Sequence, residues 1–288
     1  MAIQLLRDCR VAINREGTLY PLDAIGDVSI SSSISQVSIS RKTLFSNTSR
    51  PLMVTGKVNP TSISLTVNVS QYSDASAVLL ELIGLVGSGG SGYEYTGVTR
   101  RSPELFELEV TNKDTVVSAT PCYIESIDIS LTKDNNLMFD CTISAANIEV
   151  DVDRKPIHNI GYKASKHTPI SVKIGGVPQE RVKSASISLQ QVCEWIDGKT
   201  LFSGDGTYTH SQAILTDRLV SANATVNYDG ELINKAVVQH LEIEQSGLKL
   251  TIENARITNN FDLGSIYSVR YDCYVTEESG LVLITLEK

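Results

Sequence analysis

The sequence repeats itself in order, and this repeat limits the possible folds more than any other feature. The block Lys42–Ser46 recurs as Lys199–Ser203, at a shift of 157 residues. Three shorter matches keep the same order along the chain: Ser29–Ser31 with Ser186–Ser188, Thr66–Asn68 with Thr225–Asn227, and Phe139–Cys141 with Tyr271–Cys273. Four ordered matches are hard to attribute to chance. We therefore predict two copies of one domain, over residues 1–155 and 165–288, joined by a linker at 156–164.

Alternation of apolar and polar residues covers most of both halves. The runs that alternate are Ile63–Val69, Ile127–Leu131, Phe139–Ile143, Ala222–Tyr228 and Leu248–Ile252. A period of two places one face of a strand on a core and the other toward polar surroundings, as in antiparallel sheets. The polar positions are mainly Ser, Thr and Asn, which suit packing against other protein surface. The sequence therefore predicts a mainly β chain of two tandem, related β-sandwich domains.

One segment of the first half has helical spacing. Ala77, Leu80 and Ile83 share one side of a predicted helix over Ser73–Leu85, and Ser73 or Asp74 is a suitable cap. The shift between the copies falls from 159 to 132 across this region, so the first copy is 27 residues longer there (159 minus 132). We expect the corresponding helix of the second copy, near Glu231–Gln239, to be short or missing.

Two long segments between predicted strands are expected to form arms. The alternation changes phase near Ser35–Gln36, which indicates a bulge or turn. The segments Asn47–Thr61 and Gly204–Val220 follow the repeated blocks, and segments this long are usually functional. We expect them to reach a neighbouring subunit. The candidate interface residues are Arg50, Leu52, Met53, Val54, Lys57, Tyr208, Ile214 and Leu215.

The charge balance argues against nucleic-acid binding through phosphates. The chain has 33 acidic and 25 basic residues, a net charge of −8, and both halves share the excess. No basic half or tail is present, whereas proteins that bind nucleic-acid phosphates carry one.

The N-terminus has Arg7, Asp8 and Arg10 where a secretory signal would be apolar. The apolar stretch Ala77–Val86 is too short to span a bilayer, so we expect no membrane segment.

No motif predicts catalysis, a metal or a cofactor. The cysteines are few, odd in number and widely spaced, which favours buried free thiols over disulfides or zinc sites: Cys9, Cys122, Cys141, Cys193 and Cys273. The four histidines lie in different local contexts: His158, His167, His210 and His240. Gly87–Gly92 fits GxGxxG by letter, but it follows a predicted helix and no βαβ unit surrounds it. We therefore expect a protein that is not an enzyme.

The predicted architecture resembles the tail tube proteins of tailed bacteriophages, in particular the type in long-tailed phages that carries the tube domain twice. The resemblance rests on tandem β-sandwich domains, long arms between strands, one helix per domain, the lack of a catalytic set and a mild acidic excess. The residues that carry it are the blocks Lys42–Ser46 and Lys199–Ser203 with the arms after them, the helix Ser73–Leu85, and the closing strands around Cys141 and Cys273.

That resemblance implies a structural virion protein of the phage tail, made in the host cytoplasm. Proteins of this type form trimers with pseudo-sixfold symmetry, and these rings stack around a channel that conducts DNA without specific binding. The implied partners are further copies of the chain and other tail proteins, such as the tape measure, baseplate and terminator. An acidic channel would repel phosphates, which fits the net charge.

Other readings remain open at this stage. A tail-terminator, baseplate or distal-tail ring built on the same domain fits equally well. A β-sandwich adhesin that binds carbohydrate would need exposed aromatic residues, for which Tyr93 and Tyr95 are candidates. Trp195, the single tryptophan, is predicted to anchor a core or an interface.

Overall fold

The computed structural model describes most of the chain, and its description covers residues 2–6, 10–41, 50–69, 74–89, 92–95, 101–112, 115–132, 137–151, 168–196, 212–227, 237–262, 268–275, 279 and 281–286. The two repeated blocks, the predicted linker and Tyr208 lie outside these residues. The division into residues 1–155 and 165–288 therefore stays a prediction.

The described residues form one helix and 21 strands. The first half contains β1 (Ala2–Leu6), β2 (Arg10–Arg15), β3 (Thr18–Leu22), β4 (Ala24–Ser32), β5 (Ile34–Arg41), β6 (Arg50–Val58), β7 (Thr61–Asn68), α1 (Asp74–Leu82), β8 (Val86–Gly89), β9 (Gly92–Glu94), β10 (Phe106–Asn112), β11 (Thr115–Thr132), β12 (Met138–Ala145) and β13 (Ile148–Asp151). The second half contains β14 (Ser171–Ile174), β15 (Val177–Pro178), β16 (Val182–Trp195), β17 (Ala213–Asn227), β18 (Val237–Gln245), β19 (Leu248–Asp262), β20 (Ser268–Tyr274) and β21 (Val282–Leu286). The mainly β prediction is confirmed.

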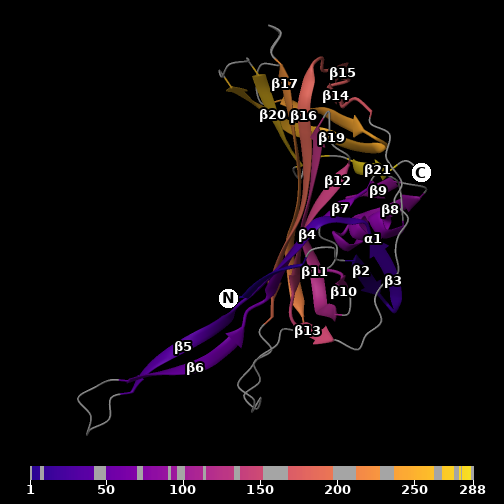
Figure 1. Cartoon of the computed structure of the whole chain (residues 1–288). Helices are drawn as coiled ribbons and strands as arrows, with labels where there is room; N and C mark the ends of the chain where they lie inside the picture. Colours follow the sequence, from indigo (N-terminus) through magenta and orange to yellow (C-terminus); the bar gives the residue numbers. More distant parts are fainter. Residues whose placement is uncertain are drawn as a thin grey trace.

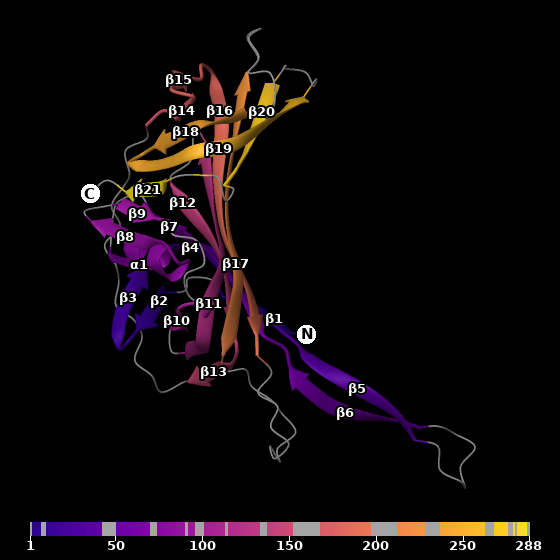
Figure 2. The ribbon, with the colours of Figure 1, turned by 180° about the vertical axis from the view of Figure 1, so that it is seen from behind.

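A tall, curved sheet organises the molecule. β16 and β17 run along most of its height, and the hairpin β2–β3 and α1 lie on one side of it (Figures 1 and 2). The opposite face of β16 and β17 is open in both views. β5 and β6 form a separate two-stranded sheet that projects from the lower end of the body (Figure 1).

The alternation seen in the sequence determines which face each strand buries. In β7, Ile63, Leu65 and Val67 are buried, whereas Ser62 and Ser64 are exposed. The same pattern holds in β11, β12, β16 and β17, and their apolar residues share a continuous core with α1. Because the apolar faces of all these strands meet one core, the polar residues are left together on the open face.

The helix α1 is shorter than the predicted segment and is buried on almost every side. It ends in a Schellman motif, in which Leu85 N–H donates to Leu80 O at 3.0 Å and Gly84 N–H donates to Glu81 O at 2.8 Å. Gly84 has φ +92°, a conformation that glycine adopts without strain. The predicted capping residue Ser73 lies outside the described residues. The region expected to hold a reduced second helix is also largely outside them.

The hairpins β10–β11 and β18–β19 pair in the same way. In the first, the register shifts between Phe106 and Leu108. In the second, it shifts between Gln239 and Leu241, which lie 133 positions further along the chain. The matching pairs, each at the same offset, are Phe106–Cys122 with Gln239–Ala255 and Asn112–Thr115 with Gln245–Leu248. The strand pairing thus repeats between the two halves, bulge included.

The strand order β4–β7–β12 likewise repeats as β16–β17–β20. Ile30 of β4 pairs with Ile63 of β7. Ile187 and Ala222, which are 157 and 159 positions further along, pair in the same way. These are the shifts that the sequence repeats have. The bulge predicted near Ser35–Gln36 is also confirmed, since the register of β5 against β6 shifts there.

The pairing corrects one of the sequence matches. The sequence aligned Cys141 with Cys273, at a shift of 132. In the structure, Leu65 pairs with Cys141, and Ala224, which lies 159 positions after Leu65, pairs with Tyr271. The equivalent of Cys141 is therefore Tyr271, at a shift of 130 (271 minus 141). A slide of two residues keeps every side chain on the same face, so an alternating pattern does not reveal it.

Candidate assembly interface

Two strands from different halves of the chain join edge to edge. β11 pairs with β16 from Ser126 to Thr132, and Ile127, Ile129 and Leu131 of β11 are buried at this seam. β11 also pairs with β12 on its other edge, so the sheet runs without interruption from the first half into the second. We call this β11–β16 pairing the seam; it joins the sheet edge of the first half to that of the second.

The lower part of the hairpin β16–β17 lies against the first half. Trp195 Nε1 donates to Ser144 Oγ at 2.9 Å, and the rings of Trp195 and Tyr123 lie 5.0 Å apart. Tyr123 is 2% and Ser144 4% exposed, because this hairpin covers them. Burial raises the pKa of the Tyr123 hydroxyl to about 12. Trp195 is therefore an anchor between the halves, in agreement with its predicted role.

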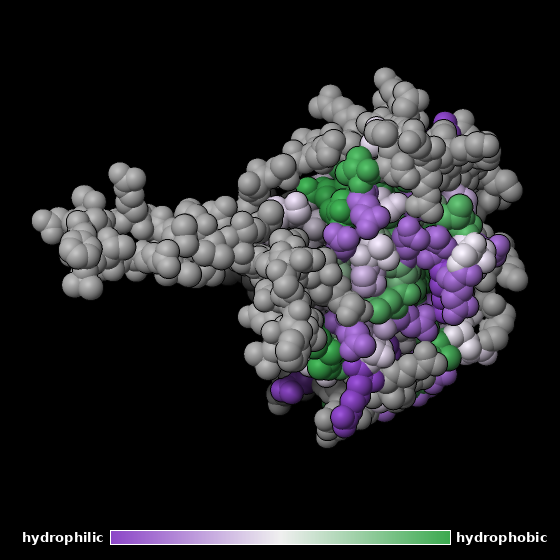
Figure 3. Space-filling view, turned by 90° about the horizontal axis from the view of Figure 1, so that it is seen from below, coloured by the Kyte–Doolittle hydropathy of each residue, from purple (hydrophilic) through white to green (hydrophobic). Residues whose placement is uncertain are grey.

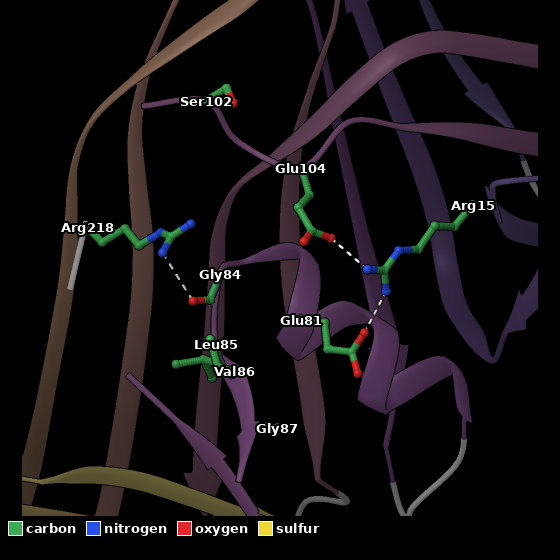
Figure 4. A pocket seen from close by; sticks show the side chains of 9 residues that line it. All are labelled: Arg15, Glu81, Gly84, Leu85, Val86, Gly87, Ser102, Glu104 and Arg218. Carbon is green, nitrogen blue, oxygen red and sulfur yellow. Dashed lines mark hydrogen bonds and ion pairs between the residues drawn. The ribbon is translucent and has the colours of Figure 1, made fainter. Parts of the chain in front are cut away.

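Two polar side chains of the second half bind the carbonyl groups at the end of α1. Gln191 Nε2 donates to Leu82 O at 2.8 Å and to Ile124 O at 3.1 Å, and Gln191 is 4% exposed. Arg218 Nη1 donates to Gly84 O at 3.2 Å (Figure 4). The last carbonyls of a helix have no partner within it, so these contacts satisfy them across the seam. The sequence reasoning did not identify Gln191 or Arg218.

A cavity of about 260 Å³ lies between the end of α1 and β17, and it is also lined by residues of β2, β8 and the loop before β10. Arg15 lies between Glu81 and Glu104, with Nη2 2.8 Å from Glu104 Oε2 (Figure 4). The bond to Glu81 raises the pKa of the Arg15 guanidinium above its usual value. Arg15 holds both carboxylates in ion pairs, an arrangement that serves structure and does not favour acid–base chemistry at this cavity.

The thiols of the described cysteines are not activated. Cys122, Cys141 and Cys273 are buried and free, and Cys193 is partly buried. Burial raises the pKa of the Cys122, Cys193 and Cys273 thiols to about 12, and it raises that of Cys141 as well. A thiol with a raised pKa is a poor nucleophile and a poor metal ligand at neutral pH.

The candidate tyrosines for sugar stacking are buried or partly buried. Tyr93 is 4% exposed. The hydroxyl of Tyr95 donates to Arg218 O at 2.7 Å, and burial raises its pKa. Both side chains belong to the contact between the two halves, which does not favour the carbohydrate-binding alternative.

Most of the candidate interface residues lie on the projecting hairpin. Arg50, Leu52 and Met53 belong to β6, and they pair with Arg41, Ile39 and Ser38 of β5. Val54 and Lys57 lie on the same strand. We call β5 and β6 together the arm. The assignment of these residues to a subunit interface stays a prediction.

The second expected arm is corrected by the structure from residue 213 onward. These residues form the lower half of β17, paired with β16, and they lie on the body of the same chain. Leu215 is 3% exposed, and its N–H donates to Arg101 O at 2.9 Å. Ile214 is 45% exposed. A strand that continues the sheet forms more backbone hydrogen bonds than a separate arm, which the sequence pattern could not weigh.

The open face of the tall sheet carries short polar side chains. They are Ser62, Ser64, Thr66, Ser126, Asp128, Ser130, Asp140, Thr142, Ser184, Ser186, Ser188, Ser221, Asn223, Thr225, Asn260, Arg270 and Asp272. We call this surface the polar face. Arg270 Nε lies 2.7 Å from Asp272 Oδ1, so this arginine is neutralised locally. None of the residues named here is a lysine.

Hydrophobic residues on the lower surface of the body are divided into separate groups among hydrophilic ones (Figure 3). A contact there would combine apolar and polar parts, as protein interfaces commonly do.

No helix in the described part of the chain has the length and apolar character needed to cross a membrane. Within the same residues, no three His, Cys, Asp or Glu side chains are grouped so as to hold a metal ion.

Comparison with known proteins identifies relatives over the whole length of the chain. The model of the Bacteriophage Baseplate Tube Protein Family matches residues 1–288. The chain is also 24% identical over 292 residues to the baseplate tube protein p140 of Escherichia phage T5, covering 99% of this chain and 98% of that protein.

Proposed function

The chain belongs to the bacteriophage baseplate tube protein family and is a component of the virion tail, and we propose that it forms closed rings of three protomers. These rings stack around a channel for DNA. The resemblance to tail tube proteins drawn from the sequence is confirmed by that family. The strand pairing supports the ring and its symmetry, and the composition of the polar face supports the passage of DNA.

The repeat of strand pairing supports the ring. The two halves have equivalent hairpins and equivalent central strands, and β11 joins β16 edge to edge. If the halves are two copies of one domain, three chains supply six such units. Joining the units through the same type of seam closes the sheet into a barrel and leaves no exposed sheet edge.

The arm supports the same arrangement. At offsets of 157 and 160 residues, the arm corresponds to the lower part of β16–β17: Ser38 pairs with Met53, and Trp195 pairs with Ala213. The lower part of β16–β17 covers the first half of its own chain. By the same geometry, the arm covers the second half of the next protomer.

The surface on which the arm would lie is exposed in the isolated chain. Tyr274 and Arg256 are at the positions equivalent to Ser144 and Tyr123, at offsets of 130 and 133 residues. Tyr274 is 50% exposed and Arg256 is also exposed, whereas their equivalents are 4% and 2% exposed. The difference is what a missing neighbour would leave uncovered. It is the observation that carries the proposal.

The polar face is suited to line the channel. Its serine, threonine and asparagine side chains hydrogen-bond water and carry no charge, and aspartates outnumber arginines among the charged residues named above. A lining with few positive charges gives phosphates little to bind, so DNA would move past it without being held.

Electron microscopy and analytical ultracentrifugation of the purified full-length chain test the ring. We expect hollow rings or tubes with near-sixfold appearance. A species that stays monomeric at high concentration would argue against the proposal.

The arm is tested by Leu52→Asp with Val54→Asp, which should leave the circular dichroism spectrum unchanged and prevent ring formation. Leu19→Asp, at an exposed leucine of β3, is the control and should assemble normally.

A second candidate is a ring present once per virion, such as a terminator or distal-tail ring. Membership of a baseplate tube family favours a place near the end of the tail. Quantitative mass spectrometry of purified virions distinguishes the two, since one ring gives three copies per virion and a stack of n rings gives 3n, with n greater than one.

A further inference from the structure

The outer edge of β4 is occupied by the N-terminal strand. β1 pairs antiparallel with residues 28–32 of β4, from Leu6 opposite Val28 to Ala2 opposite Ser32. At the offset of 157 residues, these five positions of β4 correspond to residues 185–189 of β16, which pair antiparallel with β11 at the seam. β1 therefore lies where the internal seam has β11.

The residues of β1 do not suit this place. Ile129 of β11 pairs with Ile187 and is fully buried. At the equivalent register position, β1 has Gln4 opposite Ile30. Ile3 of β1 pairs with Ser31. The equivalent of Ser31 in the seam is Ser188, and the residue opposite Ser188 is Asp128. At its three central positions, residues 3–5, β1 thus has polar and apolar residues exchanged relative to residues 128–130 of β11, whereas Leu6 and Ala2 are apolar like Leu131 and Ile127.

Residues 260–262 of β19 have the alternation of residues 128–130 of β11, which β1 lacks. β18 pairs with one edge of β19 as far as Ile257, and in the described part of the chain no strand continues on that edge beyond it. On the opposite edge, β20 pairs with β19 as far as Asp262. After the bulge of β11, β11 and β19 correspond at an offset of 132, which places Phe261 at the position of Ile129 and Asn260 at that of Asp128.

We infer that β1 holds the place of a second copy of this chain: in the ring, the end of β19 from one protomer pairs with β4 of the next and displaces β1. The register follows from the internal seam, with Asn260 opposite Ser31, Phe261 opposite Ile30 and Asp262 opposite Ser29. The inference rests on the proposed ring and specifies its joint. Until a neighbour arrives, β1 covers an edge that would otherwise attract other strands.

Engineered cysteine pairs in the full-length chain test which strand lies on β4. The pair Ser31→Cys with Asn260→Cys should form disulfides between chains in assembled rings, seen as covalent dimers and trimers on non-reducing gels. The pair Ile3→Cys with Ser31→Cys should form a disulfide within the chain in monomers and lose it in rings, as measured by mass spectrometry of digests. Ser32→Cys with Asn260→Cys is the control, shifted by one residue, and should cross-link at least fivefold less.

The outcomes separate the joint from the ring. Rings with the Ser31–Asn260 link support the inference. Rings that keep the link from residue 3 to residue 31 and lack the link between chains overturn it and leave the ring standing. Absence of rings from the unmodified protein overturns both.

A second variant, with residues 2–6 deleted, should form rings at severalfold lower protein concentration, because no strand competes for β4. A folded deletion variant that forms no rings would contradict the inference.

Discussion

Asp128 and Asp140 lie directly opposite each other on β11 and β12, and both are exposed on the polar face. Thr66 Oγ1 donates to Asp140 Oδ1 at 2.6 Å, which holds this carboxylate on the face. Like charges directly opposite on neighbouring strands are destabilising. The pair therefore lowers the stability of the isolated chain, at the place where the proposed channel would benefit from negative charge.

Removing one charge of this pair should stabilise the chain. We expect Asp140→Asn to raise the free energy of unfolding by about 0.2–1 kcal/mol, because the repulsion is lost and the amide oxygen still accepts from Thr66. Chemical denaturation at neutral pH measures it. Asp272→Asn is the control with the opposite sign, since Asp272 contacts Arg270 and accepts from Asn260 Nδ2 at 2.8 Å. A destabilised Asp140→Asn variant would show that the repulsion is screened.

The end of α1 should not tolerate a side chain at Gly84. Gly84→Ala places a Cβ at φ +92° and against the guanidinium of Arg218. We expect a loss of about 1–2 kcal/mol from the backbone alone, with a further loss from moving Arg218 off the carbonyl. Thermal unfolding measures it, and Gly87→Ala, where a Cβ meets nothing within 4 Å, is the control. Equal stability of the two variants would contradict this account.

The seam should depend on Gln191. Gln191→Met fills the same space but leaves the carbonyls of Leu82 and Ile124 without this donor, so we expect a loss of about 1–3 kcal/mol in the free energy of unfolding. Gln190→Met, at the exposed neighbour, is the control and should change stability little. A loss equal to that of the control would assign the seam to the strand pairing alone.

The sequence was sufficient for what is local and periodic. Strands, helix and bulge are visible in it because alternation and helical spacing are local properties. The match of Cys141 with Cys273 was two residues off, since the pattern is unchanged by a slide of two. The seam, Gln191 and Arg218 were not predictable, because they depend on which strand edges meet. Ser186–Ser188, which the repeat aligned with Ser29–Ser31, was the signal that could have shown which edges are equivalent.

One carboxylate should make stability depend on acid. Hydrogen bonds from Lys173 and His240 lower the pKa of Glu242 to about 2, from an ordinary value of 4.5. A lowered pKa stabilises the fold above pH 4.5, and this contribution is lost as the pH falls toward 2. Chemical denaturation between pH 6 and pH 3 should show a smaller loss for Glu242→Gln than for the unmodified protein. Lys173→Met should reduce the loss in the same way, and identical curves for all three proteins would contradict the assignment.

The proposed channel should become adhesive when its lining is made basic. Ser130 is exposed on the polar face beside the seam, where it pairs with Ser186. Ser130→Lys would add three positive charges to each ring, and we expect assembled rings to bind DNA at low salt and to release it as salt rises. Thr18→Lys, at the exposed start of β3 on the other side of the sheet, makes the same charge change outside the channel. A filter-binding titration in which both variants retain DNA equally would place the polar face outside the channel.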